Sequence, residues 1–144
     1  MKLQRMVNQA GYLMMALTLS FSSVAEWVVE EGYVRKPIPG RSMTAAFMDL
    51  RNVSDTDSTL ISAKLEGAKS VEIHTHSHVD GMMRMRQLHE LTIKAGETMS
   101  FEPGGLHLMI FGIKALPESP ELTLCDKNQV CSTHILTTRS LVKK

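Results

Sequence analysis

Short segments in which apolar and polar residues alternate run along most of the chain. Glycine, proline, asparagine and aspartate separate them, and no long segment shows the 3.6-residue period of a helix. The segments that we expect to be strands are 26–29, 43–50, 60–65, 71–78, 82–93, 98–101, 106–113, 122–125 and 130–138. This pattern predicts an all-β protein, built as a sandwich or barrel.

The strongest local signal is for a β-hairpin between residues 71 and 93. Asp80-Gly81 is typical of a two-residue hairpin turn. The register that this turn sets has the cross-strand pairs Val79–Met82, His78–Met83 and His76–Met85. Because strand side chains alternate between faces, His74, His76 and His78 share one face with Met83 and Met85. His74 is diagonal to Met85, within reach of long side chains.

Candidate metal ligands gather in residues 71–113, which contain five of the six histidines and five of the eleven methionines. His107 and Met109, two residues apart, share a strand face. Imidazole and the soft thioether are neutral ligands that together favour Cu(I) over hard divalent ions. A divalent ion would also keep two uncompensated charges in a half-buried site, which is costly. The candidate ligands are His74, Met85, His107 and Met109, with His76, His78 and Met83 as possible additional ones.

The spacing of these ligands is specific. Ten residues separate His74 from Met85, and twenty-one separate Met85 from the pair His107-x-Met109. This spacing resembles the HX10MX21HXM signature of the periplasmic PCu(A)C copper chaperones. Segments 44–52, 71–74, 83–86 and 103–109 also resemble that family, and the similarity spans about residues 27–124. The resemblance implies a cupredoxin-like Greek-key β-sandwich with the metal site near one end. It also implies that the protein delivers Cu(I) towards the copper site of cytochrome oxidase.

The nitrogen ligand on the hairpin is left open by the sequence. In the expected register His76 is directly opposite Met85 and therefore nearer to it than His74 is. His76 could replace His74, or His76 and His78 could bind Cu(II) at a secondary site. We expect Met83 to pack against the protein, Met99 to lie in the core, and His89 and His134 to be solvated.

Residues 1–25 have the features of a secretory signal peptide: Lys2 and Arg5, an apolar stretch, and Ser23-Val24-Ala25 as a cleavage site. An uncleaved anchor is the alternative, and the lack of a cysteine near the cleavage site argues against a lipoprotein. The mature domain would be residues 26–144, soluble, periplasmic and monomeric. Without Lys2 and Arg5 it has fourteen basic and fifteen acidic residues. This balance argues against nucleic acid as a partner.

The two cysteines, Cys125 and Cys131, are expected to form one structural disulfide, as is usual in a secreted chain. The alternative is a thiol pair that binds copper or exchanges electrons. The five-residue separation fits neither a CxxC motif nor a familiar zinc pattern.

Two other functions compete with copper delivery. His76-x-His78-x-Asp80 is similar to part of the HxHxD signature of zinc-dependent metallo-β-lactamases, but Gly81 stands where another histidine should follow. A periplasmic metal buffer or sensor would use the same ligands without specific delivery. We therefore expect a non-enzymatic copper chaperone, whose partner is a copper acceptor such as an oxidase copper domain or another chaperone.

Overall fold

The computed structural model describes residues 27–141, so the signal peptide expected at 1–25 lies outside the described residues. The strands are β1 (Trp27–Arg35), β2 (Met43–Asn52), β3 (Ser58–Leu65), β4 (Ser70–Val79), β5 (Met82–Leu88), β6 (Leu91–Ile93), β7 (Thr98–Phe101), β8 (His107–Phe111), β9 (Glu121–Asp126), β10 (Cys131–Ile135) and β11 (Thr137–Arg139). Within this part of the chain no helix is long and apolar enough to cross a membrane.

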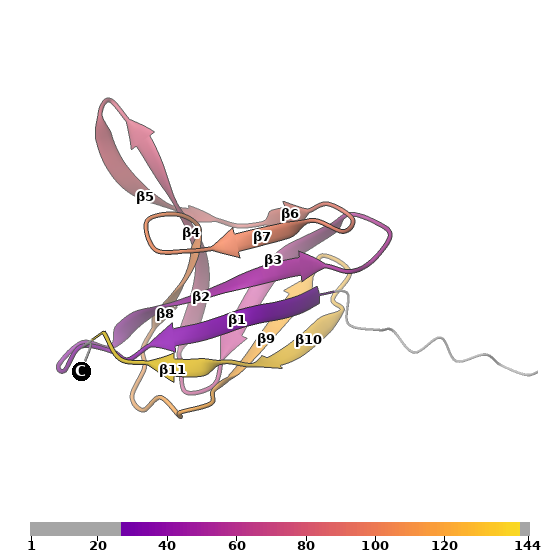
Figure 1. Ribbon diagram of the computed structural model, residues 1–144. Coiled ribbons are helices and arrows are strands. Elements are labelled where there is room, and N and C mark those ends of the chain that lie inside the picture. The colour runs from indigo at the N-terminus through magenta and orange to yellow at the C-terminus, as the bar shows by residue number, and fades with distance from the viewer. Residues whose placement is uncertain (1–26, 142–144) are drawn as a thin grey trace, which may run out of the picture.

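The strands form two sheets that pack as a sandwich (Figure 1). The larger sheet has the order β11-β1-β2-β8-β4-β5, with β7 paired to a second part of β2, and the smaller has the order β10-β9-β3-β6. Neighbouring strands are antiparallel except β11, which runs parallel to β1. The all-β sandwich predicted from the sequence is confirmed.

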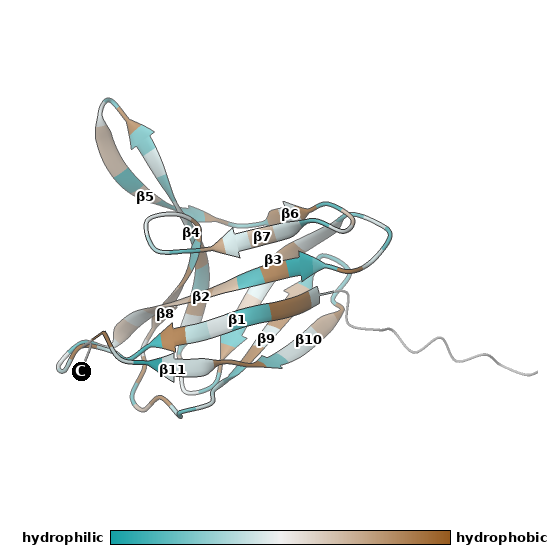
Figure 2. Ribbon diagram, viewed as in Figure 1, coloured by the Kyte–Doolittle hydropathy of each residue, from teal (hydrophilic) through white to brown (hydrophobic). Residues whose placement is uncertain are grey.

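The core lies between the sheets and contains the apolar residues of each alternating strand. Fully buried side chains include Leu50, Leu108 and Ile110 from the larger sheet and Leu60, Leu122 and Leu124 from the smaller. Figure 2 shows that hydrophobic and hydrophilic positions are interspersed along the strands. Burying each such side chain contributes about 1.5–3 kcal/mol. Because Leu108 and Ile110 point inward, His107 and Met109 are placed on the outer face of β8.

The β4–β5 hairpin projects beyond the sandwich (Figure 1). Its turn has positive φ at both Asp80 (53°) and Gly81 (74°), as a type I′ turn requires. Val79–Met82, His78–Met83 and His76–Met85 are paired as predicted. Residues 75–79 of β4 pair only with β5, and β5 is exposed along its length except at Leu88.

The expectation of one continuous strand over 82–93 is wrong. β5 ends at Leu88, and β6 pairs with β3 in the smaller sheet. The chain crosses between the sheets at this point, and Ile93 becomes fully buried on the other side of the core. Similarly, the segment expected over 130–138 divides into β10 in the smaller sheet and β11 in the larger.

Cys125 and Cys131 form the expected disulfide. They are directly opposite each other in the β9–β10 register, with their Cα atoms 4.1 Å apart. The bridge therefore staples a hairpin of the smaller sheet, and the candidate metal ligands belong to strands of the larger sheet.

Candidate metal site

Three neighbouring strands bring the candidate ligands together on the outer face of the larger sheet. β8 carries His107 and Met109, β4 carries His74 and His76, and β5 carries Met85. His74 pairs with His107 in the β4–β8 register, and the imidazole ring centroids are 5.9 Å apart. His76 is two residues further along β4, past the last residue that pairs with β8. Its ring centroid is nevertheless only 5.4 Å from that of His107.

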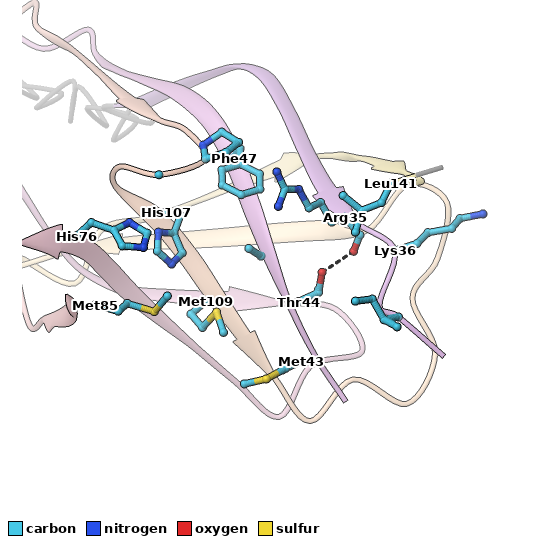
Figure 3. Close-up of a pocket in the computed structure, with 14 residues that line it drawn as sticks. Arg35, Lys36, Met43, Thr44, Phe47, His76, Met85, His107, Met109 and Leu141 are labelled. Atoms are coloured by element: carbon cyan, nitrogen blue, oxygen red, sulfur yellow. Dashed lines mark hydrogen bonds between the residues drawn. The ribbon is translucent and has the colours of Figure 1, made fainter. Parts of the chain in front are cut away.

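An open cleft of about 310 Å³ lies beside these side chains. His76, Met85, His107 and Met109 approach one another at one end of it (Figure 3). The rest of the lining is mainly apolar with two cations: Arg35, Lys36, Ile38, Met43, Thr44, Ala45, Phe47, Pro103, Gly104 and Leu141. His74 is paired with His107 across β4 and β8, but it does not line the cleft.

The carbonyl oxygen of Gly105 orients two of the imidazoles. It is 3.0 Å from Nδ1 of His107 and 3.2 Å from Nδ1 of His76. Because a carbonyl can only accept, both Nδ1 atoms carry the proton, and each Nε2 keeps a free lone pair. Histidines that bind metals commonly donate their other N–H to a carbonyl or carboxylate in this way.

His74 is held differently, by a carboxylate. Its Nε2 is 2.8 Å from Oε2 of Glu72, two residues earlier on the same face of β4. Its Nδ1 is buried and has no hydrogen-bond partner among the described residues. An Nε2–H that donates to Glu72 leaves the Nδ1 lone pair free, an arrangement that is common among histidines that bind metals.

The environment keeps His107 neutral. Burial lowers the pKa of His107 below its usual 6.5, and charge on His76, His74 and Arg35 lowers it further, whereas the hydrogen bond to Gly105 acts in the opposite direction. A neutral imidazole is the form that coordinates a metal. His107 is therefore available as a ligand at neutral pH without first losing a proton.

The donor set fits a soft ion. Within residues 27–141 no three His, Cys, Asp or Glu side chains are grouped so that they could hold a metal ion by themselves. A metal in this cleft would therefore depend on the thioethers of Met85 and Met109. Thioether sulfur selects Cu(I), and hard ions such as Mg²⁺ or Ca²⁺ prefer oxygen. The HxHxD-like segment, with the exposed Asp80 in the hairpin turn, forms no such three-residue group either.

The outer candidates and the other histidines are placed as follows. His78 and Met83 are opposite each other one step further out on the hairpin, and Met83 is 57% exposed, so the expectation that Met83 packs against the protein is wrong. Met99 packs against the core and His89 is exposed, as expected. His134 was expected to be solvated, but it is half-buried and within 2.8 Å of Ser132 Oγ.

Two partners of the histidines were missed in the sequence. The strand period alone places Glu72 on the face of His74, so this carboxylate could have been found. The role of the Gly105 carbonyl could not have been found, because every residue has a backbone carbonyl and the sequence does not show which one accepts a hydrogen bond. Phe47, whose ring centroid is 6.3 Å from that of His107, was also missed as a wall of the site.

Comparison with known proteins identifies the family. The sequence model described as putative lipoprotein LpqE-like matches residues 27–123, most of the described chain. The chain belongs to the LpqE-like family. A putative lipoprotein of Leifsonia xyli subsp. xyli, Lxx21020, is 34% identical over 77 residues. That alignment covers 53% of this chain and 46% of the relative, so the chain spans about half of the relative's length.

Solved structures similar to this LpqE-like chain include PCuAC domains, and the family is of PCuAC type. The copper-bound PCuAC domain from PmoF2 has a TM-score of 0.65 and 20% identity, over 83% of this chain and 97% of that one. The Cu(I) form of DR1885 from Deinococcus radiodurans has a TM-score of 0.64 and 29% identity, over 81% and 79%. The PCu(A)C resemblance and the predicted fold are therefore confirmed. The lipoprotein description points to an envelope protein, and the expectation that this chain is not lipidated stays a prediction.

Proposed function

We propose that this LpqE-like protein is a non-enzymatic copper chaperone that binds one Cu(I) through His74, Met85, His107 and Met109. One observation carries the proposal: the imidazoles of His76 and His107, each hydrogen-bonded through Nδ1 to the Gly105 carbonyl, lie beside two thioethers at an open cleft, and His74 pairs with His107 on the neighbouring strand. The copper-bound PmoF2 domain and the Cu(I) form of DR1885, which share the fold, support it. His76 lines the cleft with its ring centroid 5.4 Å from that of His107 and is the alternative to His74 as the second nitrogen ligand.

The ligands suit a carrier that releases its ion. No thiolate takes part, since both cysteines are joined in the disulfide. Met85 is 47% exposed, so an acceptor can approach the ion from the hairpin side. Each step of transfer would exchange a neutral thioether or imidazole for a donor of the acceptor. The ion stays Cu(I), and the protein's own ligands need no deprotonation to bind it again.

The acceptor that we propose is the copper domain of a cytochrome oxidase or another copper chaperone, in the periplasm. A buffer or sensor would have the same ligands but would not transfer copper faster than the ion dissociates. Stopped-flow mixing of the Cu(I)-loaded protein with a purified oxidase copper domain distinguishes these functions. Transfer whose rate increases with acceptor concentration supports a chaperone, and a rate independent of the acceptor supports a buffer.

The first test is an anaerobic titration of the protein with Cu(I) in competition with a coloured Cu(I) chelator. We expect one tight equivalent, and Met109→Leu should weaken it by more than the roughly 10–100-fold that loss of an outer-shell partner costs. Met82→Leu, on the other face of the hairpin, is the matched control and should bind as the wild type does. Weak Cu(I) binding, or equal affinity in Met109→Leu, would overturn the proposal.

A further inference from the structure

The β4–β5 hairpin carries two successive His–Met pairs on one face. His76 is opposite Met85, and His78 is opposite Met83. Side chains that oppose each other across a hairpin have Cβ atoms about 4.5–5.5 Å apart. The two pairs are separated by two residues, about 7 Å along the strands. The inner pair lines the cleft, but the outer pair is not part of the proposed site.

The outer pair is exposed to solvent. Met83 is 57% exposed and His78 is exposed, on a part of the hairpin where β4 pairs only with β5. Three unbranched thioethers, at positions 82, 83 and 85, are thus exposed on a single projecting hairpin. Clustered exposed apolar side chains commonly mark a binding site.

The two faces of the hairpin differ in charge. Arg84 and Arg86 pair with Ser77 and Thr75, on the face opposite to the histidines. Arg86 Nε donates to Ser77 Oγ at 3.1 Å, which keeps that guanidinium on its own face. The His–Met face therefore carries imidazole and thioether donors and is separated from the hairpin's own cations, which would repel a copper ion.

We infer that His78 and Met83 form a second, outer Cu(I) site through which the ion enters and leaves the inner site. One imidazole and one thioether are acceptable donors for Cu(I) but too few to hold it tightly. The ion passes to His76 and Met85 by exchanging one neutral ligand at a time, without a change of oxidation state. This inference rests on the proposed function, because the outer site has a purpose only if the inner one holds copper.

The test follows the methionine methyl groups by NMR in protein labelled with ¹³C-methyl methionine and titrated with Ag(I), a redox-inert probe for Cu(I). The first equivalent should shift Met85 and Met109. The second should shift Met83 and leave Met82 unchanged. Met82 is an internal control, since it is 55% exposed, nearly as much as Met83, but pairs with Val79 on the other face.

The possible outcomes separate the two proposals. Shifts at Met85 and Met109 with none at Met83 would overturn the outer site and leave the inner site intact. Equal shifts at Met82 and Met83 would mean unspecific thioether binding, which also overturns it. No shift at Met85 or Met109 would overturn the proposed function itself.

A kinetic experiment tests the route. Met83→Leu should slow the transfer of Cu(I) to a chelator while the equilibrium affinity of the inner site stays that of the wild type. Met82→Leu should change neither quantity, and His78→Gln should behave as Met83→Leu does. Unchanged transfer rates in both Met83→Leu and His78→Gln would show that copper does not pass through this pair.

Discussion

His76 is directly opposite Met85 across the β4–β5 hairpin, whereas His74 is opposite Gln87 and pairs with His107 on its other side. The motif spacing selects His74 and strand pairing selects His76. One ring nitrogen of His74 is hydrogen-bonded to Glu72, and one of His76 to Gly105. The other nitrogen of each ring is free. His74 and His76 are thus two candidates for the second nitrogen ligand beside His107.

The first prediction concerns this choice. His74→Gln should lower the Cu(I) affinity about tenfold or more, because it removes a proposed ligand whose Nδ1 has no hydrogen-bond partner among the described residues and is free to bind the ion. His76→Gln should lower it less, since His74 and His107 remain. Competition titration of both variants shows which one loses more Cu(I) affinity. A larger loss in His76→Gln would make His76 the ligand and His74 the alternative.

Glu72 should act on copper through His74. Glu72→Ala removes the carboxylate that accepts from Nε2, so His74 loses its fixed orientation, and Cu(I) affinity should fall about 10–100-fold. Glu72→Gln keeps an acceptor oxygen and should recover much of the loss. If both variants bind Cu(I) as the wild type does, Glu72 does not position the ligand.

The disulfide should affect stability and not metal binding. Replacing Cys125 and Cys131 by serine together removes a short loop constraint, which should lower the free energy of unfolding by about 2–3 kcal/mol. Urea denaturation measures this loss. The Cu(I) affinity should stay constant because the bridge belongs to the other sheet. A collapse of the affinity would place the sulfurs in the site.

Acid should destabilise the fold partly through His134. Burial lowers the pKa of His134 in the folded protein below the 6.5 of an unperturbed histidine. Below pH 6.5 the unfolded chain binds more protons at this residue than the folded one, so the free energy of unfolding decreases as the pH falls. Urea denaturation at pH 7.5 and pH 5 should show a smaller decrease in His134→Gln than in the wild type. Equal decreases in the two proteins would show that His134 does not cause the loss of stability in acid.

Asn52 should be among the most sensitive polar positions. It is fully buried, and its Nδ2 donates to the carbonyls of Thr56 and Ile93 while its Oδ1 accepts from Ser54. Asn52→Ala leaves these groups without their partner and should cost about 2–3 kcal/mol of unfolding free energy, measured in urea. A loss below about 0.5 kcal/mol would mean that water replaces the side chain.

The hairpin was predictable because its register depends on two residues. Asp80-Gly81 sets the turn, and a strand period of two then decides which side chains share a face. The crossing after Leu88 was not predictable, since alternation continues through 82–93 and does not say with which sheet a strand pairs. Nor could the sequence show that the Gly105 carbonyl orients both His76 and His107.

The parallel pairing of β11 with β1 has a practical consequence for producing the protein. It returns the chain to the cleft, where Leu141 and Arg35 are both part of the lining. A polyhistidine tag fused close behind Leu141 would therefore lie near the cleft and would compete with the protein's own imidazoles for copper. Trp27 is at the opposite end of the nine-residue β1, about 27 Å from Arg35. Purification handles for copper measurements therefore belong on the amino-terminal side.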